Sequence, residues 1–193
     1  KEQILFTGSQ NISEEQYKPA VLFSNGQKIA FFAITDLLNG YDRYADPYVV
    51  TSSDEDLENL IFHIKQNKKK MDWIIVSMHA GNEYQKKPST RQKKLAHALI
   101  DSGADIIIGH HPHVPQGIER HNSGIIFYSL GNFAFWQPFE FWTQNSFVLE
   151  ITLKPNHVFE YKIVPVEAGW QPKLVEDMDA QKKMIDYIAK LQI

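Results

Sequence analysis

Cysteine is absent from this 193-residue chain. Its absence excludes disulfide bridges, thiolate metal ligands and cysteine nucleophiles, and it leaves the redox compartment undetermined. Long apolar runs are also missing, because no stretch approaches the roughly 20 consecutive apolar residues that a membrane-spanning helix needs. Any metal site or catalytic centre in this sequence must therefore use side chains other than cysteine.

The chain also lacks a large excess of either positive or negative charge. The 20 lysine and arginine residues nearly balance the 23 aspartate and glutamate residues, and no basic run is longer than Lys68–Lys70. This balance predicts neither a nucleic-acid partner nor binding to an anionic membrane surface. With 43% hydrophobic residues, the chain is long enough to bury one sizeable core. We expect a single domain over residues 1–193.

Apolar strands and amphipathic helices alternate along the chain, which predicts an α/β fold. Ser53 with Asp56 and Ser89 with Gln92 have the spacing of capping boxes at helix starts. We expect helices over 54–67, from Ser89 to Gly103 and over Asp177–Gln192. The second of these helices has an expected buried stripe of Leu95, Ala98 and Leu99. We expect strands over Lys28–Asp36, Asp72–Met78, Ala104–Gly109 and Ile125–Asn132, and a hairpin of strands 146–154 and 157–167.

Histidines follow two of these strands at the point where each strand ends. Two apolar strands joined by a helix in about 30 residues form a βαβ unit, so both strands end at the same edge of the sheet. His79 follows the first of these strands, and His110, His111 and His113 follow the second. Ligands of open α/β sheets bind at this edge. We therefore expect these four histidines to converge.

A histidine cluster of this kind favours metal binding. Neutral imidazole is a suitable ligand for Zn, Mn or Fe, and His-x-His on a tight loop can present two rings to one metal ion. A single histidine at a strand end is more often an ordinary hydrogen-bonded surface residue, but burying several titratable rings without a partner is costly. The remaining histidines are expected to be solvated: His63, His97, His121 and His157.

Three linked segments resemble a known family. They are "VSMHAGNEY" (Val76–Tyr84), "GADIIIGHHPHVPQGIE" (Gly103–Glu119) and "IFYSLGNFAF" (Ile126–Phe135). In this order and spacing they resemble the CapA family of poly-γ-glutamate capsule biosynthesis proteins, which belongs to the calcineurin-like metallophosphoesterase superfamily. The resemblance extends from Ile4 to Val166.

The resemblance implies a β-sandwich core flanked by helices, with two divalent metal ions (Mn, Zn or Fe) at the strand ends. His79, His111 and His113 match the metal ligands of the family motifs. His110 is extra relative to the simplest superfamily pattern, and it is either a further ligand or a catalytic residue that donates a proton or a hydrogen bond to the substrate.

Three polar residues beside this motif are candidates for contacts with substrate. Asn82 and Glu83 follow His79, where they can contact substrate or hold the His79 ring; the alternative is a loop that only caps the next helix. Asn132 follows a turn at Gly131 and is expected to face the crevice as a substrate contact.

The superfamily's first half supplies Asp-x-His, Gly-Asp and Asn-His motifs, and none is present where it is expected. The segment Lys1–Gly8 resembles the family segment that follows that first half. We therefore expect the C-terminal portion of a CapA-like domain, without its N-terminal strands and the ligands they carry. Without a bridging carboxylate, such a portion should bind at most one metal ion and be inactive alone.

Six aromatic residues fall within ten positions, Phe133–Trp142. One interpretation makes them the rim of a substrate groove, because aromatic faces stack on sugars and other flat ligands. The favoured alternative is a hydrophobic plug, or a surface on which the missing N-terminal half or a second copy of the chain packs.

Two function classes follow from the resemblance. The first is a metal-dependent, phosphoesterase-type hydrolase that acts on poly-γ-glutamate, another envelope polymer or a phosphoester. The second is a non-catalytic polymer-binding or assembly and export factor. An acidic polymer would prefer a basic groove, and Lys86, Lys87, Arg91, Lys93 and Lys94 cluster near the site, although a solvated helix face explains them equally well. Proteins of this family are associated with the outward-facing side of the bacterial cell envelope.

Overall fold

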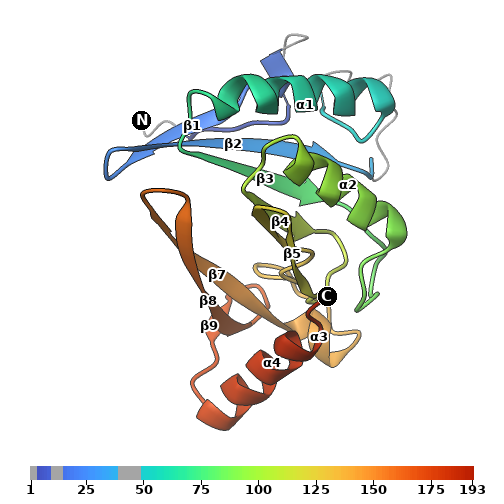
Figure 1. The fold of residues 1–193 in the computed structure, drawn as a ribbon. Coiled ribbons are helices and arrows are strands. Elements are labelled where there is room, and N and C mark those ends of the chain that lie inside the picture. Colours follow the sequence, from blue (N-terminus) through green and yellow to red (C-terminus); the bar gives the residue numbers. More distant parts are fainter. Residues whose placement is uncertain (1–3, 10–14, 39–48) are drawn as a thin grey trace.

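The computed structural model describes residues 4–9, 15–38 and 49–193 (Figure 1), so the first three residues of the Lys1–Gly8 segment lie outside it. A short 3-10 turn at Glu15–Tyr17 precedes the first strand. The strands are β1 (Ala20–Ser24), β2 (Gln27–Thr35), β3 (Trp73–His79), β4 (Ile106–His110), β5 (Ile118–His121), β6 (Gly124–Phe127), β7 (Asn145–Lys154), β8 (Val158–Glu167) and β9 (Lys173–Leu174). The helices are α1 (Asp54–Lys68), α2 (Thr90–Asp101), α3 (Phe141–Gln144) and α4 (Met178–Lys190).

A six-stranded sheet in the order β1-β2-β3-β4-β6-β5 forms the centre of the fold. Its four inner strands are parallel, and the edge strands β1 and β5 pair antiparallel with β2 and β6. The inner strands are rich in Ile, as expected of parallel strands that are covered on both faces. The βαβ unit made of β3, α2 and β4 is therefore confirmed.

The two faces of this sheet are covered differently (Figure 1). Helices α1 and α2 lie on one face, where Leu60, Ile64 and Leu99 pack against Val76 and Ile107. Each of these fully buried aliphatic side chains contributes about 1.5–3 kcal/mol relative to an exposed one. This layer holds the helices in register above the strands.

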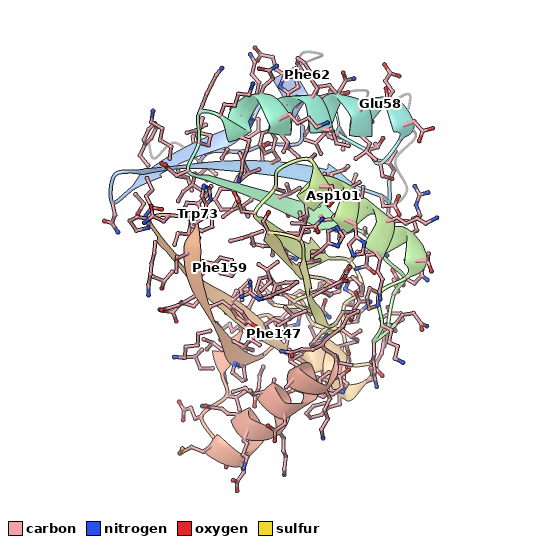
Figure 2. The ribbon with its side chains drawn as sticks, viewed as in Figure 1. Glu58, Phe62, Trp73, Asp101, Phe147 and Phe159 are labelled. Carbon is pink, nitrogen blue, oxygen red and sulfur yellow. The ribbon has the colours of Figure 1, made fainter. Side chains whose placement is uncertain are left out.

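The other face packs against a second sheet, β7-β8-β9, and against α4. Figure 2 shows Trp73, Phe147 and Phe159 between the two sheets, and the rings of Trp73 and Phe159 meet edge to face with centroids 6.1 Å apart. The mixed α/β fold, a sheet-on-sheet sandwich flanked by helices, is thus confirmed.

The two helix starts show how far capping patterns determine local structure. Ser89 and Gln92 form the complete capping box of α2. Ser53 accepts a hydrogen bond from the Asp56 backbone N–H, but the Asp56 carboxylate accepts from Tyr17 Oη at 2.6 Å instead of returning to the Ser53 backbone. The second expected box is therefore half formed, because a tertiary contact outcompetes the local one.

Two expectations about strands and helix faces need correction. The fourth strand ends at Phe127 rather than Asn132. Beyond it, backbone hydrogen bonds continue at Tyr128, Ser129 and Leu130, but the only bridge they form within the described residues is the isolated one between Pro115 and Leu130. The buried stripe of α2 contains Ala96 rather than Ala98, which is only half-buried.

The expectation that all four remaining histidines are solvated is wrong for His97 and His121. Their side chains are only 31% and 24% exposed, and their rings stack with centroids 3.9 Å apart. The cause is strand β5, whose short sequence gave no strand signal and which carries His121 against α2. Among the helices of the described ranges, none is both long enough and apolar enough to cross a membrane.

Candidate metal centre

The four histidines expected at the carboxyl edge of the sheet do converge there. His79 ends β3 and His110 ends β4, and the two residues are direct partners in the parallel register. The His79 and His111 ring centroids lie 4.8 Å apart, and those of His111 and His113 lie 5.9 Å apart. Residues separated by more than 30 positions thus form one cluster.

Gly109 explains the glycine between the aliphatic run and the histidines. A Cβ atom at this position would lie 2.0 Å from the Tyr128 carbonyl oxygen, a separation that no side chain tolerates. The Gly109 carbonyl in turn accepts a hydrogen bond from the Leu130 N–H at 3.2 Å. Only glycine lets β4 approach the segment after β6 closely enough to place the histidine loop.

Unusual backbone conformations hold the site loops. His111 and His113 have φ angles of +99° and +63°, and Tyr84 in the loop after β3 has a φ of +61°. Non-glycine residues in this region cost about 1–3 kcal/mol each, and such strain concentrates at functional sites. The two loops support each other, since the Tyr84 N–H donates to the Pro112 carbonyl at 2.8 Å.

His111 carries the clearest sign of a missing ligand. Its side chain is buried, and its Nδ1 atom has no hydrogen-bond partner among the described residues. A buried polar atom without a partner costs about 1–3 kcal/mol, and native proteins rarely leave one unsatisfied. A metal ion bound to a free ring nitrogen removes this cost, so the residues present fit a divalent metal ion.

Asn132 fixes the orientation of the His113 ring. The Asn132 Oδ1 atom lies 2.8 Å from His113 Nδ1, which leaves His113 Nε2 free for a ligand. The Asn132 amide nitrogen donates to the Thr143 carbonyl at 2.9 Å and to Gln137 Oε1 at 3.1 Å. Because the Asn132 side chain is buried and bonded on both sides, the geometry favours a positioning role over the predicted substrate contact. Partners of this kind set ring orientation and ligand basicity at metal sites.

Glu83 supplies a carboxylate next to the cluster. A Glu83 carboxylate oxygen and one ring nitrogen each of His111 and His113 lie within 4.8 Å of one another. Glu83 is exposed, as is its neighbour Asn82, whose carbonyl accepts from the Gln85 N–H at 3.4 Å. Glu83 is therefore a candidate further ligand, and the substrate contacts of Asn82 and Glu83 remain predictions.

The environment of the cluster favours the neutral form of three imidazoles, those of His79, His110 and His111. Burial lowers the pKa of His79, and the neighbouring histidines His111, His110 and His113 lower it further. Burial also lowers the pKa of His110 and of His111, and for His111 it outweighs the opposing influence of Glu83. Neutral imidazole is the form that binds metal ions.

Asp36, which follows β2 at the same edge of the sheet, was not among the residues predicted for the site. Its N–H donates to the His79 carbonyl at 2.8 Å, and its carboxylate accepts from Arg91 Nε and Nη2 and from the Ser52 hydroxyl. Burial on its own would raise the pKa of Asp36, but these bonds and the nearby His111 lower it overall. The sequence signal that could have identified Asp36 is its position at the end of an expected strand, Lys28–Asp36.

The aromatic segment Phe133–Trp142 lies beside the metal centre. Five of its aromatic side chains are between 44% and 72% exposed: Phe133, Phe135, Trp136, Phe139 and Phe141. The Phe135 ring stacks on His113 with centroids 5.6 Å apart, and Phe139 meets Tyr84 at 5.9 Å. A buried plug is therefore wrong for these five residues, while a groove rim and a docking surface both remain compatible with their exposure.

The sequence matches a family model along most of its length. The model for "Bacterial capsule synthesis protein PGA_cap" covers residues 1–137. The chain belongs to this family.

Relatives in the family are substantially similar to this chain. The "PGA biosynthesis protein CapA" of Bacillus subtilis (strain 168) is 37% identical over 160 residues, which is 81% of this chain and 41% of that protein. The "Capsule biosynthesis protein CapA" of Bacillus anthracis is 39% identical over 147 residues, or 74% of this chain and 35% of that protein. The chain thus spans about two fifths of the length of these relatives.

The solved structures that resemble this capsule synthesis chain are more distant. A putative 5′-nucleotidase from Staphylococcus aureus, in complex with α-ketoglutarate, has a TM-score of 0.49 and 12% identity, over 94% of this chain and 35% of that chain. A hypothetical protein from Thermus thermophilus also has a TM-score of 0.49, with 16% identity over 75% of this chain and 60% of that chain. These similarities are too low to support a particular activity.

Proposed function

We propose that this chain carries the histidine half of a metal-dependent, phosphoesterase-type hydrolase centre in a capsule synthesis protein. One observation carries the proposal. The rings of His79, His111 and His113 lie close together, Glu83 has a carboxylate oxygen within reach of ligand atoms of His111 and His113, and the buried His111 Nδ1 atom has no hydrogen-bond partner among the described residues. Such a set of free imidazole nitrogens and a carboxylate is typical of sites for Zn, Mn or Fe.

Each residue has a role in this proposal. His79, His111 and His113 hold the metal ion, Glu83 adds a carboxylate ligand, and Asn132 keeps His113 in its binding orientation. A bound divalent ion would polarise a phosphoryl oxygen and lower the pKa of a bound water molecule. His110, half-buried beside His79, donates a proton or a hydrogen bond to the substrate.

The charge of the ligand set limits this chain to one metal ion. Three neutral imidazoles and the Glu83 carboxylate carry a single negative charge, which does not offset two divalent cations. The other nearby carboxylate, Asp36, is already bonded to Arg91. Further carboxylates must come from elsewhere, and we place them in the N-terminal half of the family domain or in a second copy of the chain. The isolated chain is then inactive.

The relatives indicate the class of substrate. Their names refer to capsule and PGA biosynthesis, and a 32% identical relative from Mycobacterium tuberculosis is a "Probable polyglutamine synthesis accessory protein". We place this chain in the same process, at the outward-facing side of the cell envelope, with poly-γ-glutamate or a related anionic polymer as its ligand. Lys86, Lys87 and Lys93 line a hollow on the protein surface that suits such a polymer.

A non-catalytic role in polymer binding or export is the second candidate. The exposed aromatic side chains of Phe133–Trp142 favour it, because an apolar rim next to a basic hollow can hold a polymer without cleaving it. In this case the metal centre would organise the binding surface and would not catalyse hydrolysis.

Hydrolysis by the complete capsule synthesis protein separates the two candidates. Phosphate release from a chromogenic phosphoester and glutamate release from poly-γ-glutamate are measured for the natural protein, for His79→Ala and for His157→Ala as a control outside the cluster. Turnover that His79→Ala abolishes and His157→Ala preserves supports the hydrolase. Polymer binding without turnover in all three proteins supports the export factor and contradicts the hydrolase.

A further inference from the structure

A second group of ligand-type side chains lies away from the metal centre. His97 on α2 and Glu119 and His121 on β5 each present one ligand atom, and these three atoms lie within 4.8 Å of one another. His121 pairs with Gly124, the first residue of β6, so it lies at the amino edge of the parallel strands. The histidines of the metal centre lie at the opposite, carboxyl edge.

Hydrogen bonds already orient the members of this group. His97 Nε2 lies 2.8 Å from Glu119 Oε1, and His121 Nε2 lies 2.9 Å from Asp101 Oδ1. The other Glu119 oxygen accepts from the hydroxyl of Tyr128, which is fully buried. A carboxylate fixed from behind in this way resembles the outer support that metal ligands receive.

The charge at this position favours a cation. Two groups hold the Glu119 carboxylate: the Tyr128 hydroxyl donates to its Oε2 atom at 2.7 Å, and His97 Nε2 lies 2.8 Å from its Oε1 atom. Asp101 is the last residue of α2 (Figure 2), and the carbonyl groups at a helix C-terminus add partial negative charge. Together the two carboxylates exceed the single positive charge of Lys93, which lies near Glu119.

We propose that His97, Glu119 and His121 form a second metal site, for Zn²⁺, which joins the C-terminal half of α2 to strand β5. Two imidazoles and one carboxylate are a ligand set that zinc takes in proteins, and Asp101 or water completes the tetrahedron. Zinc binding would break the hydrogen bonds of His97 to Glu119 and of His121 to Asp101, and each displaced proton would move to the other nitrogen of its ring or to solvent.

Binding requires one local rearrangement. The two rings are parallel to within 2°, and the in-plane lone pairs of parallel rings do not meet at one point. At least one ring must therefore rotate out of the stack. Both side chains are partly exposed, and their carboxylate partners are on separate elements, so rotation about the side-chain bonds is enough.

The site has a structural consequence for the capsule synthesis chain. β5 is an edge strand of four residues that pairs only with β6 in the described sheet, and such short edges are held weakly. A zinc ion would anchor β5 to α2.

The test is a calorimetric titration of the 193-residue chain with Zn²⁺. In a His111→Ala/His113→Ala background, which removes two ligands of the metal centre, we expect one Zn²⁺ to bind. Adding His121→Ala should weaken this binding by at least about 100-fold. Loss of a residue that only supports a metal ligand weakens binding by up to about 100-fold, so loss of a direct ligand should cost at least as much. His157→Ala, a half-exposed histidine outside both groups, should leave it unchanged.

A variant with a side chain of similar size and a spectroscopic readout distinguish loss of the metal site from misfolding. His97→Gln in the same background should abolish the visible absorption of tetrahedral Co²⁺ while preserving the far-ultraviolet circular dichroism. If the background itself does not fold, the same substitutions in the natural chain should reduce bound Zn²⁺ by one equivalent. Zinc binding that neither His121→Ala nor His97→Gln weakens would overturn the proposal.

Discussion

The histidine group at the carboxyl edge of the sheet and the one at the amino edge are built in opposite ways. At the carboxyl edge, His111 and His113 lie on strained backbone with φ angles of +99° and +63°. At the amino edge, His97 belongs to a regular helix and His121 to a regular strand. Among the histidines of the two groups, positive φ angles thus occur only at the edge where we place catalysis, while at the amino edge Asn122 has a φ of +49°.

The two groups also differ in the hydrogen-bond partners of their histidine nitrogens. Each amino-edge histidine has a carboxylate within 2.9 Å of its Nε2 atom. At the carboxyl edge, His113 bonds to a neutral amide and the His111 Nδ1 atom has no partner in the described part of the chain. The amino-edge group already has carboxylate partners, so a metal ion there must replace existing hydrogen bonds, whereas a metal ion at His111 would satisfy an atom that has no partner in the described part of the chain. An unpaired buried nitrogen therefore indicates a ligand site more directly than the number of histidines does.

The largest effect is expected at Gly109, which sets the position of the carboxyl-edge loop. Gly109→Ala places a Cβ atom 2.0 Å from the Tyr128 carbonyl oxygen and should lower the free energy of unfolding by about 3 kcal/mol. Gly169→Ala is the matched control, because its Cβ would meet only Trp136 at 3.7 Å. Chemical denaturation measures both. Equal stability of the two variants would show that the loop is not held by this close approach.

The next largest effect is expected when the asparagine that supports the carboxyl-edge group is replaced, and a matched asparagine at the amino edge serves as its control. Asn132→Ala removes the partner of His113 Nδ1 and should weaken Mn²⁺ binding at the carboxyl edge by about 10- to 100-fold. Asn122→Ala removes the amide that donates to Asp101 at 2.7 Å, so it should leave Mn²⁺ binding unchanged. Calorimetric titration measures both variants. Mn²⁺ binding that responds equally to the two substitutions would contradict the separation of the sites.

The smallest effect concerns Asp36 beside the metal centre. Asp36→Asn loses the charge-assisted bonds from the largely exposed Arg91 and should destabilise the fold by about 1 kcal/mol at pH 7. Because the pKa of Asp36 is lowered in the folded state, this stabilisation is present above the pKa of the unfolded state and is lost as pH falls through the folded pKa.

Denaturation at two pH values tests the sign of this effect. The stability difference between the natural chain and Asp36→Asn should disappear at strongly acidic pH, where the carboxyl group is protonated in both states. A difference that stays constant from pH 7 to strongly acidic pH would mean that the Asp36 charge is not what stabilises this edge.

The carboxyl-edge group was predictable from the sequence because its members are local to strand ends. Apolar strands around one helix place His79 next to His110, and "GHHPH" keeps His111 and His113 within three residues. The order of elements therefore determines the convergence. The strain at His111 was not predictable, since no residue pattern distinguishes this loop from an unstrained turn.

The amino-edge group and the Asp36 contact were not predictable, because both depend on tertiary packing. Strand β5 reads "IERH", which lacks the alternation of a half-buried strand, so no signal places His121 against His97. Asp36 and Arg91 are separated by 55 positions, and many charged residues of the chain would have been equally plausible partners. Periodicity predicts elements, but not which side chains on different elements meet.

Anomalous X-ray diffraction from crystals of the 193-residue chain soaked in Mn²⁺ would locate the bound metal ion. We expect one manganese peak within coordination distance of His79, His111 and His113, with the Glu83 carboxylate beside it. A soaked crystal in which these three imidazoles coordinate no manganese, while the ion occupies other positions on the chain, would contradict the assignment of this edge as a metal centre.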